Sequence, residues 1–465
     1  MSLTSMEERR VALFIVSLGS FLTPFMASSI NVAIPLIEKD FSVKAALLTW
    51  IASSYLLSAA IFLIPFGKIA DIYGRKKIFK LGVIIYISAS VFSGFSPSFL
   101  FFIFSRILQG LGGAMILSAS VAILTSMFPV GERGEALGLN VAAVYLGLSL
   151  GPFIGGFLTQ NLGWRSLFIL NIPLGMLIIL LAHLKLKREL CEAEKGKFDL
   201  IGFLIYSFML AITLCGFSFL PKLIGSLMIL TGFLGFLAFV KWENRVENPI
   251  LNINLFKENK VFTFSNLAAL INYSATFAVS FLLSIYLQHI KGFNPQNAGV
   301  ILSSQPIVQA LFSPAAGKLS DIIEPRVIAS IGMALTFITL LSFSFLSDSS
   351  SLIFILISLI VLGLSFALFS SPNTNAVMSS IKEKFYGVAS ATLATMRLIG
   401  QSLSMGISGV IFAIYIGESE VTIEHHSVLL KAIKTLFTIF AFLCFIGIFA
   451  SLKRGKIIYN KHLLY

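Results

Sequence analysis

Long apolar runs recur along the whole of this 465-residue chain, and they constrain its fold more than any other feature. The first begins at Val11 and continues to about Ile37, and the later runs are separated by short polar segments. A helix needs about 20 predominantly apolar residues to cross a bilayer, and backbone groups inside the bilayer must be paired within the chain. The runs therefore predict a polytopic membrane protein built only from helices.

The composition excludes several other classes. The chain is 57% hydrophobic and 12% charged, whereas soluble proteins carry about 25% charged residues. The excess of Lys and Arg lies mostly in short loops, so it indicates membrane orientation rather than a nucleic-acid partner. Cys191, Cys215 and Cys444 form no disulfide or metal-ligand pattern. We expect no metal and no cofactor.

Fourteen spanning helices are predicted from the lengths of the runs. Their ranges are 11–36, 46–66, 79–95, 99–128, 136–159, 166–184, 199–219, 223–241, 262–287, 297–316, 327–346, 351–374, 387–415 and 428–451.

The distribution of basic residues predicts that both termini are cytoplasmic. With the N-terminus inside, most Lys and Arg residues fall in cytoplasmic segments, as the positive-inside rule requires. The outer loops then carry only Lys39, Lys44, Arg165, Lys222 and Lys291. The first apolar run is too long for the core of a cleavable signal peptide. We expect a multi-pass protein of the cell (inner or plasma) membrane that retains this first helix.

An internal repeat divides the chain. The segment Gly67-Lys-Ile-Ala-Asp71 recurs 250 residues later as Gly317-Lys-Leu-Ser-Asp321, and Gly147 recurs as Gly400. Repeated halves around a central site are common in secondary transporters. The repeat predicts a six-helix half at 1–185, two extra helices with cytoplasmic linkers at 186–261, and a second six-helix half with a cytoplasmic tail at 262–465.

Several segments carry recognisable motifs, and they cover nearly the whole chain. The motifs are Gly67-Lys-Ile-Ala-Asp71-Ile-Tyr-Gly74-Arg75, Arg106-Ile-Leu-Gln109-Gly110, Gly147-Leu-Ser-Leu-Gly151-Pro152-Phe-Ile-Gly155-Gly156, and the stretches at 164–175 and 198–202. They resemble motifs A, B and C of the major facilitator superfamily and two stretches typical of its fourteen-span drug:proton antiporter branch. The resemblance implies a 6+2+6 arrangement of helices and multidrug-efflux-like transport.

The resemblance also implies roles for the motif residues. Motif A, with Gly67, Asp71, Gly74, Arg75 and the repeat residue Asp321, would form a charge latch between the halves; its basic loop alternatively reports only membrane orientation.

Motif B places Arg106, Gln109 and Gly110 in a span. A cation there is usually functional or paired. The resemblance implies that Arg106 assists coupling, and we expect the same of a second buried cation, Arg397. The alternative for Arg106 is snorkelling to the membrane interface.

Motif C spaces small residues along one helix face, which permits close helix packing, and its proline permits a bend. Its residues are Gly147, Gly151, Pro152, Gly155 and Gly156.

One departure from the family bears on the substrate. The family often carries an Asp in the first span, and the matching position here is Met26. All 21 acidic residues fall in loops, tails or span boundaries. A cavity without carboxylates favours a neutral or anionic amphiphile over a cation. The side chains expected to line it are Met26, Asn31, Tyr55, Asn266, Asn272, Gln309 and Asn373, although ordinary interhelical hydrogen bonds would also explain their polar members.

The sequence thus predicts a monomeric secondary transporter that exports small amphiphilic molecules by alternating access, and the resemblance implies that protons drive it by antiport. Its partners would be the substrate, protons and the lipid bilayer. Two alternatives remain: an uncoupled facilitator or flipper of a neutral or anionic lipid-like substrate, and a membrane sensor that does not transport. The chain has no Gly-rich ATP-binding loop and no acid pair or nucleophile–base pair at membrane depth, so neither an ATP-driven pump nor an enzyme is expected.

Overall fold

A computed structural model describes residues 6–43, 45–128, 133–186, 198–220, 222–246, 249–251, 253–381, 386–417 and 426–455, and its regular elements within these ranges are all helices. They are α1 (Met6–Phe41), α2 (Ala45–Leu48), α3 (Trp50–Tyr73), α4 (Arg75–Gly94), α5 (Phe99–Met127), α6 (Arg133–Leu162), α7 (Arg165–Lys185), α8 (Leu200–Phe219), α9 (Leu223–Glu243), α10 (Asn254–Glu258), α11 (Lys260–Thr276), α12 (Ala278–Ile285), the π-helical turn η1 (Tyr286–Ile290), α13 (Pro295–Ile322), α14 (Pro325–Phe343), α15 (Leu352–Ser379), α16 (Tyr386–Tyr415) and α17 (His426–Leu452).

Polar side chains fix where several of these helices begin. The side chains of Ser98, Asp199, Asn259, Asn294 and Ser351 each accept a hydrogen bond from the backbone amide three residues later. Such caps satisfy one of the amides that the first turn of a helix leaves unpaired. Each cap thus sets the level at which a helix enters the bundle.

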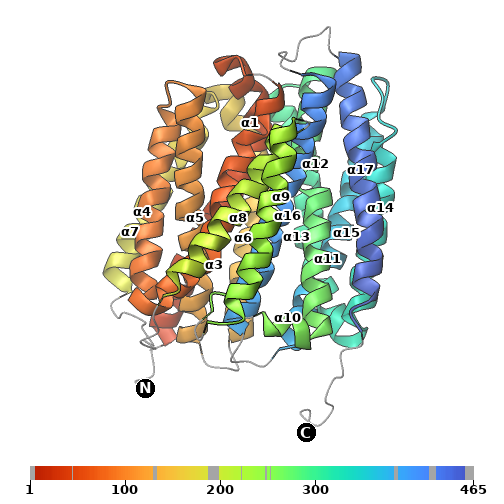
Figure 1. Cartoon of the computed structure of the whole chain (residues 1–465). Coiled ribbons are helices and arrows are strands. Elements are labelled where there is room, and N and C mark those ends of the chain that lie inside the picture. The colour runs from red at the N-terminus through yellow and green to blue at the C-terminus, as the bar shows by residue number, and fades with distance from the viewer. Residues whose placement is uncertain are drawn as a thin grey trace.

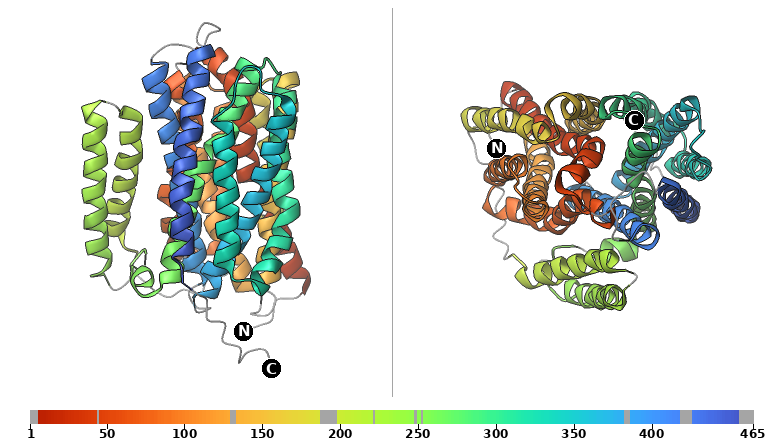
Figure 2. Two further views of the ribbon diagram at one scale, coloured as in Figure 1. Left: turned by 90° about the vertical axis from the view of Figure 1, so that its right-hand side faces the viewer. Right: turned by 90° about the horizontal axis from the view of Figure 1, so that it is seen from above.

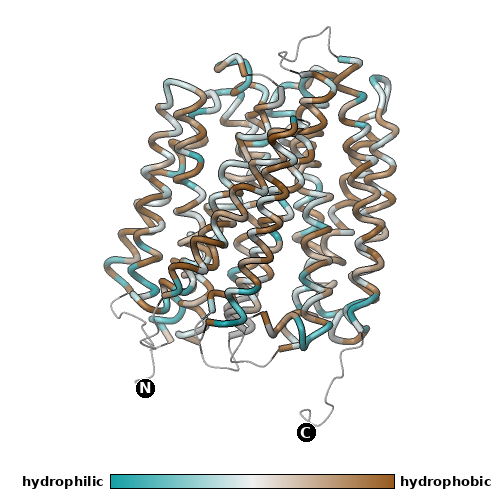
Figure 3. The backbone as a smooth tube through the Cα atoms, viewed as in Figure 1, coloured by the Kyte–Doolittle hydropathy of each residue, from teal (hydrophilic) through white to brown (hydrophobic). Residues whose placement is uncertain are grey.

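The prediction of an all-helical polytopic membrane protein is confirmed. Among the described residues, thirteen helices are long and apolar enough to cross a membrane, with α11, α12 and η1 counted as one span. The one predicted span not among these thirteen is 297–316. It corresponds to α13, which has 28 residues and packs against α6 and α15. Its amide side chains, which include Gln305 and Gln309, make it more polar than its neighbours. Brown apolar segments fill the middle of the bundle in Figure 3, and hydrophilic residues gather toward the helix ends.

Helices α1 to α7 and α11 to α17 pack in the same way within each half. The pairs α1·α6, α3·α5 and α4·α7 of the first half correspond to α11·α16, α13·α15 and α14·α17 of the second. Equivalent glycines make the crossings possible: a Cβ at Gly147 would lie 2.6 Å from the carbonyl oxygen of Phe21, and one at Gly400 would lie 2.6 Å from that of Leu270. Seen from above in Figure 2, the two halves lie side by side.

Helices α8 and α9 form a hairpin that stands outside the two halves (Figures 1 and 2). Helix α8 packs against α3 of the first half and α16 of the second. The hydroxyl of Tyr206 on α8 donates a hydrogen bond to the carbonyl oxygen of Ala60 on α3, at 3.0 Å. The hairpin therefore contacts both halves along one side of their junction.

The start of α1 and the end of α17 lie at the same end of the bundle (Figure 1). We call this end the terminal side and the opposite end the distal side. Helices α1, α6 and α16 run from the terminal side to the distal side. Helices α3, α5 and α13 run in the opposite direction.

Candidate functional site

A group of polar side chains lies about halfway along the helices, where the two halves face each other. It consists of Tyr145 on α6, Tyr273 on α11, Gln309 on α13, Ser370 and Thr374 on α15, and Arg397 on α16, and we call it the midplane cluster. The hydroxyls of Tyr145 and Ser370 are 2.8 Å apart, so a hydrogen bond joins the first half to the second. The hydroxyl of Tyr273 lies 3.5 Å from the same serine oxygen.

Arg397 supplies the positive charge of the midplane cluster. Its Nη2 donates to Thr374 Oγ1 at 3.1 Å, and its guanidinium carbon lies 5.4 Å from the centre of the Tyr273 ring. Its Nε is buried and has no hydrogen-bond partner. The side chains of Arg397, Tyr145 and Tyr273 are all half-buried rather than fully enclosed. The cluster therefore presents a cation, two aromatic faces and an unused donor at the junction of the halves.

Sequence reasoning named Arg397 and Gln309 for this region but missed Tyr145 and Tyr273. Gln309 lies next to the Tyr145 hydroxyl and accepts a hydrogen bond from Gln305 at 3.1 Å. A tyrosine at the middle of an apolar run carries a hydroxyl that needs a partner inside the membrane. That feature was the available signal for both residues.

The other residues predicted to line a cavity are buried within the helix bundle. Met26, Asn31, Tyr55, Asn266, Asn272 and Asn373 are all at most 5% exposed. Each of the four asparagines nevertheless has one buried side-chain atom without a hydrogen-bond partner. Buried amides are normally paired, and each unpaired group costs about 1–3 kcal/mol. These amides therefore hold unused hydrogen-bonding capacity close to the centre of the bundle.

Motif B forms a closed network within the first half. Arg106 on α5 is 1% exposed; its Nε donates to the carbonyl oxygen of Ile51 at 3.1 Å, and its guanidinium carbon lies 4.8 Å from the centre of the Tyr55 ring. Its Nη1 donates to Gln109 Oε1, and Gln109 Nε2 donates to Ser90 Oγ at 2.9 Å. Arg106 is thus held among α3, α4 and α5, apart from the midplane cluster.

Gly110 explains why α5 comes so close to α3. A Cβ at Gly110 would collide with the carbonyl oxygen of Tyr55 and lie 2.8 Å from the Cβ of Ser58. The repeat residue Gly363 on α15 meets the carbonyl oxygen of Gln305 on α13 in the same way. The glycine of motif B therefore serves the packing of a helix pair that both halves share.

Motif A ties three helix ends together at the terminal side of the first half. Arg75 Nε and Nη2 both lie 2.8 Å from Asp71 Oδ1, and Nη1 donates to the carbonyl oxygen of Ala122 at 3.0 Å. Gly74 has φ 111°, a conformation that favours glycine, and it allows the sharp turn from α3 to α4. Gly67 leaves room beside Ser118 on α5. Asp321 ends the matching segment on α13, and its side chain lies outside the described residues.

Motif C packs α6 against both halves. Gly147, Gly151 and Gly155 face α1, where Ser29 Oγ donates to the carbonyl oxygen of Gly151 at 2.9 Å. Gly156 faces α13 instead: a Cβ there would lie 2.6 Å from the carbonyl oxygen of Pro295 and 3.3 Å from Cα of Gly299. Pro152 contributes its carbonyl oxygen to the same contact, because a Cβ at Gly299 would collide with it.

Other contacts between the halves lie at the distal side. Gln288 Nε2 in η1 donates to the carbonyl oxygen of Val32 on α1 at 3.0 Å, and His289 Nε2 lies 3.2 Å from Glu38 Oε2. Glu38 is 6% exposed and belongs to the last turn of α1, which extends past the end of the predicted span. Together with the crossing of α6 and α13 near Gly156, these contacts hold the halves against each other at the distal side.

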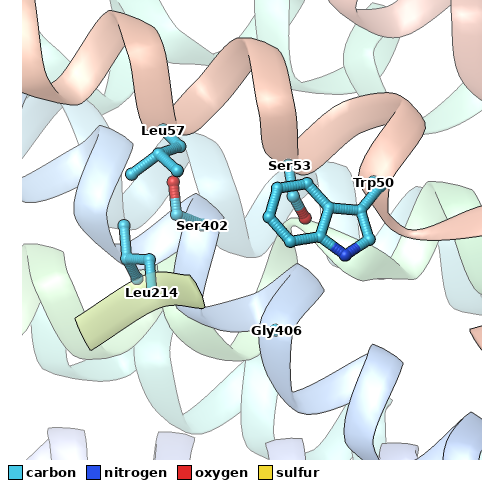
Figure 4. A pocket seen from close by; sticks show the side chains of 6 residues that line it. All are labelled: Trp50, Ser53, Leu57, Leu214, Ser402 and Gly406. Carbon is cyan, nitrogen blue, oxygen red and sulfur yellow. The ribbon is translucent and has the colours of Figure 1, made fainter. Parts of the chain in front are cut away.

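A small crevice lies where α8 meets α3 and α16, away from the midplane cluster. It is lined by Trp50, Ser53 and Leu57 of α3, Leu214 of α8, and Ser402 and Gly406 of α16 (Figure 4). The Ser53 and Ser402 hydroxyl oxygens are buried without partners. The crevice shows that the hairpin does not close completely over the junction of the halves.

Comparison with known proteins matches most of the chain to one family. The model of the Major Facilitator Superfamily matches residues 16–242 and 266–456. Among curated relatives, the riboflavin transporter RibZ of Clostridioides difficile is 29% identical over 448 residues, which cover 95% of this chain and 97% of that protein. The tetracenomycin C resistance and export protein of Streptomyces glaucescens is 27% identical, covering 87% and 76% of the two chains.

Solved structures agree on the fold. A bacterial homologue of the human lysosomal transporter Spinster, in an inward-facing and unoccupied conformation, superposes with a TM-score of 0.69. The match covers 97% of this chain and 98% of that one at 17% sequence identity. This likeness concerns the arrangement of the helices.

Proposed function

This chain belongs to the Major Facilitator Superfamily, and from that premise we propose that it exports small amphiphilic molecules that are neutral or anionic. As a transporter of this superfamily, it handles a small-molecule substrate in a membrane. The observation that carries the proposal is the midplane cluster, which joins the two halves through Tyr145 and Ser370 and contains the cation Arg397.

The charges at the centre of the bundle favour this substrate class. The acidic residues that the structure describes lie near helix ends or in the segments between helices, whereas Arg397 lies near the middle of α16. A lipophilic cation would meet a like charge there and find no carboxylate to replace its hydration. An anion or a hydrogen-bond acceptor could instead use the free Nε of Arg397.

Aromatic substrates fit the same residues. Tyr145 and Tyr273 offer half-buried rings, and Gln309 with the unpaired asparagine amides offers hydrogen bonds. Riboflavin, named in the description of one relative, is a planar aromatic molecule that carries hydroxyl groups. Ring stacking combined with hydrogen bonds is suited to molecules of this kind. The substrate class that follows is an aromatic amphiphile without a positive charge.

Alternating access would open the two sides in turn around the midplane cluster. The contacts near Gly156, Gln288 and His289 close the distal side in this conformation. Breaking them while closing the terminal side would move the cluster from one side to the other. We assign the terminal side to the cytoplasm of a cell membrane, because the basic residues concentrate there.

The energy source divides the proposal into two forms. Proton-coupled antiport is the form that the resemblance to drug:proton antiporters implies, and it needs a titratable group that changes its exposure during the cycle. The lack of an acidic residue in the middle of a span favours the second form, an uncoupled facilitator or flipper. The two forms differ in whether a pH gradient drives substrate accumulation.

Variants of the midplane cluster test the proposed site. Arg397→Met should lower transport of an anionic aromatic substrate about 10- to 150-fold, because it removes a charge-assisted hydrogen bond worth about 1.5–3 kcal/mol. Transport of a neutral analogue should fall less. Tyr145→Phe should reduce transport of both substrates, because it removes the hydroxyl that forms a hydrogen bond with Ser370.

Tyr415→Phe is the matched control, since its hydroxyl lies 3.1 Å from Thr435 at an exposed position outside the cluster. Equal transport by the folded Arg397→Met, Tyr145→Phe and control variants would exclude the midplane cluster as the substrate site.

A further inference from the structure

Two carboxylates meet at the terminal end of the α8–α9 hairpin. Asp199 immediately precedes α8, and Glu243 is the last residue of α9. The hairpin brings them together although they are 44 positions apart in the sequence. Figure 1 shows these two helices side by side, with α10 below them. Motifs A, B and C include neither residue.

Asp199 is well supplied with hydrogen-bond donors. Its Oδ1 accepts from the backbone amide of Gly202 at 2.9 Å, which caps α8. The indole Nε1 of Trp242 donates to both carboxylate oxygens, at 3.2 Å to Oδ1 and 3.0 Å to Oδ2. Donors of this kind stabilise the ionised form of a carboxyl group.

Glu243 has a different environment. It is 3% exposed, and its Oε2 accepts from the backbone amide of Leu251 at 2.9 Å. Its Oε1 is buried and has no hydrogen-bond partner. A Cβ at Gly202 would lie 2.8 Å from this oxygen and would collide with Asp199 Oδ2, so both oxygens converge over the glycine. Two acceptors therefore face the same small space, and one of them lacks a donor.

Charges nearby compensate this pair only in part. Lys68 of α3 is half-buried and faces Glu243. Among the described residues of the neighbouring segments, the other cations are Lys241, Arg245, Lys257 and Lys260, all of them exposed, and Lys257 Nζ donates to Asn244 Oδ1 at 3.0 Å. Two ionised carboxylates that share a buried site repel each other strongly, so such pairs commonly hold one proton.

We propose that Asp199 and Glu243 form a proton-binding site that holds one proton on Glu243 at neutral pH. The proton converts Glu243 Oε1 into a donor toward Asp199 Oδ2. This satisfies the unpaired oxygen and leaves one negative charge, on the carboxylate that three N–H contacts already stabilise.

The site lies where a change of charge can act on both halves. Glu243 holds Leu251, in the segment that leads from α9 to α10 and then to α11 of the second half. Helix α8 contacts α3 and α16, and Tyr206 binds the backbone of α3. Loss of the proton places two like charges beside Gly202 and separates the ends of α8 and α9. Any effect on transport rests on the proposed function, whereas the proton site itself does not.

Infrared difference spectroscopy of the reconstituted full chain, titrated with acid and base without substrate, tests the site directly. A protonated carboxylic acid gives a carbonyl band that an ionised carboxylate lacks. We expect this band at neutral pH, and we expect Glu243→Gln to abolish it. Glu258→Gln is the control, because Glu258 is an exposed residue of α10 and its replacement should leave the band unchanged.

Two further variants keep the proposal falsifiable if Glu243→Gln does not fold. Asp199→Asn removes the neighbouring negative charge and should move the loss of the band to lower pH by about one unit. Lys68→Ala removes a facing positive charge and should move the loss to higher pH. A band that is missing at neutral pH, or one that neither variant moves, would overturn the proton site. A transport failure with these titrations intact would refute only the proposed function.

Discussion

Gly156 on α6 is the position where a single methyl group should separate the two halves. A Cβ there would lie 2.6 Å from the carbonyl oxygen of Pro295 and 3.2 Å from Cα of Gln296, both at the start of α13. Ordinary contacts begin at 3.4 Å, so Gly156→Ala must push α13 away from α6 by several tenths of an ångström. The obstructing atoms belong to the backbone and cannot turn aside as a side chain can.

The magnitude follows from the cost of overpacking. Inserting a methyl group into a well-packed contact costs about 1–3 kcal/mol. Because this contact joins the halves at the distal side, the cost applies to conformations closed there and is relieved in conformations open there. A difference of about 1–3 kcal/mol shifts the equilibrium about 5- to 150-fold toward the distally open state.

Distance measurements between two spin labels can detect this shift. Leu162 at the end of α6 is 69% exposed and Phe345 after α14 is 72% exposed, so cysteines at both positions can carry labels on the distal side of opposite halves. The three native cysteines would first be replaced by serine. Pulsed electron–electron double resonance should show a larger population of long distances between the labels in Gly156→Ala than in the parent chain.

Gly138→Ala is the matched control on the same helix. A Cβ at Gly138 meets nothing within 4 Å, so this variant should keep the parent distance distribution. If Gly156→Ala folds and gives the same distribution as Gly138→Ala, the α6–α13 contact does not govern distal closure and the reasoning is refuted.

Three other variants test separate parts of the structure. Gly147→Ala should lower thermal stability without changing the label distances, because its Cβ would lie 2.6 Å from the carbonyl oxygen of Phe21 inside one half; a changed distance would contradict this. Arg106→Met should destabilise the folded protein by about 3 kcal/mol, since it leaves buried partners of the guanidinium unpaired, and unchanged thermal unfolding would argue against the network. Burial lowers the pKa of Arg454 to about 9, below the value of an arginine in the unfolded chain. Folding therefore disfavours the charged form, and the free energy of unfolding should rise as the pH rises through about 9. Arg454→Gln should therefore raise the melting temperature at neutral pH and remove that alkaline rise, and an unchanged profile would show that the buried charge carries no cost.

Much of the helical framework could be predicted from the apolar runs. Runs of sufficient length must become helices in a bilayer, and the repeated glycines at 147 and 400 indicated two similar halves before their equivalent contacts were known. The local geometry of motif A was also accessible, because Asp71 and Arg75 are one helical turn apart and Gly74 allows a left-handed turn. These features depend on residues that are close in the sequence.

The midplane cluster could not be assembled in the same way. Tyr145 and Ser370 are 225 positions apart, and their hydrogen bond depends on how the two halves face each other. Periodicity indicates which residues are buried but does not distinguish a buried contact within one half from a contact between halves. For this reason the cavity prediction, which was based on polarity at membrane depth, included Gln309 but not Tyr145 or Tyr273.

The pair of Asp199 and Glu243 was hidden for a related reason. Both residues stand at span boundaries, where acidic residues are usually solvated. Glu243 is buried and Asp199 is half-buried, and their approach depends on the close packing of α8 and α9 and on the missing side chain of Gly202. A sequence position at the end of an apolar run therefore does not indicate how exposed its side chain is.

Substrate transport by the purified protein in liposomes tests the central claim most directly. The vesicles would be loaded in turn with cationic, neutral and anionic aromatic amphiphiles of similar size, and flux would be recorded with and without an imposed pH gradient. The account predicts that neutral or anionic compounds cross and cations do not, and that Arg397→Met selectively reduces the anionic flux. A substrate flux that the pH gradient accelerates would identify the antiport form. A flux that does not respond to the gradient would identify the uncoupled form. Transport restricted to cations, or no flux of any class by folded protein, would contradict the claim.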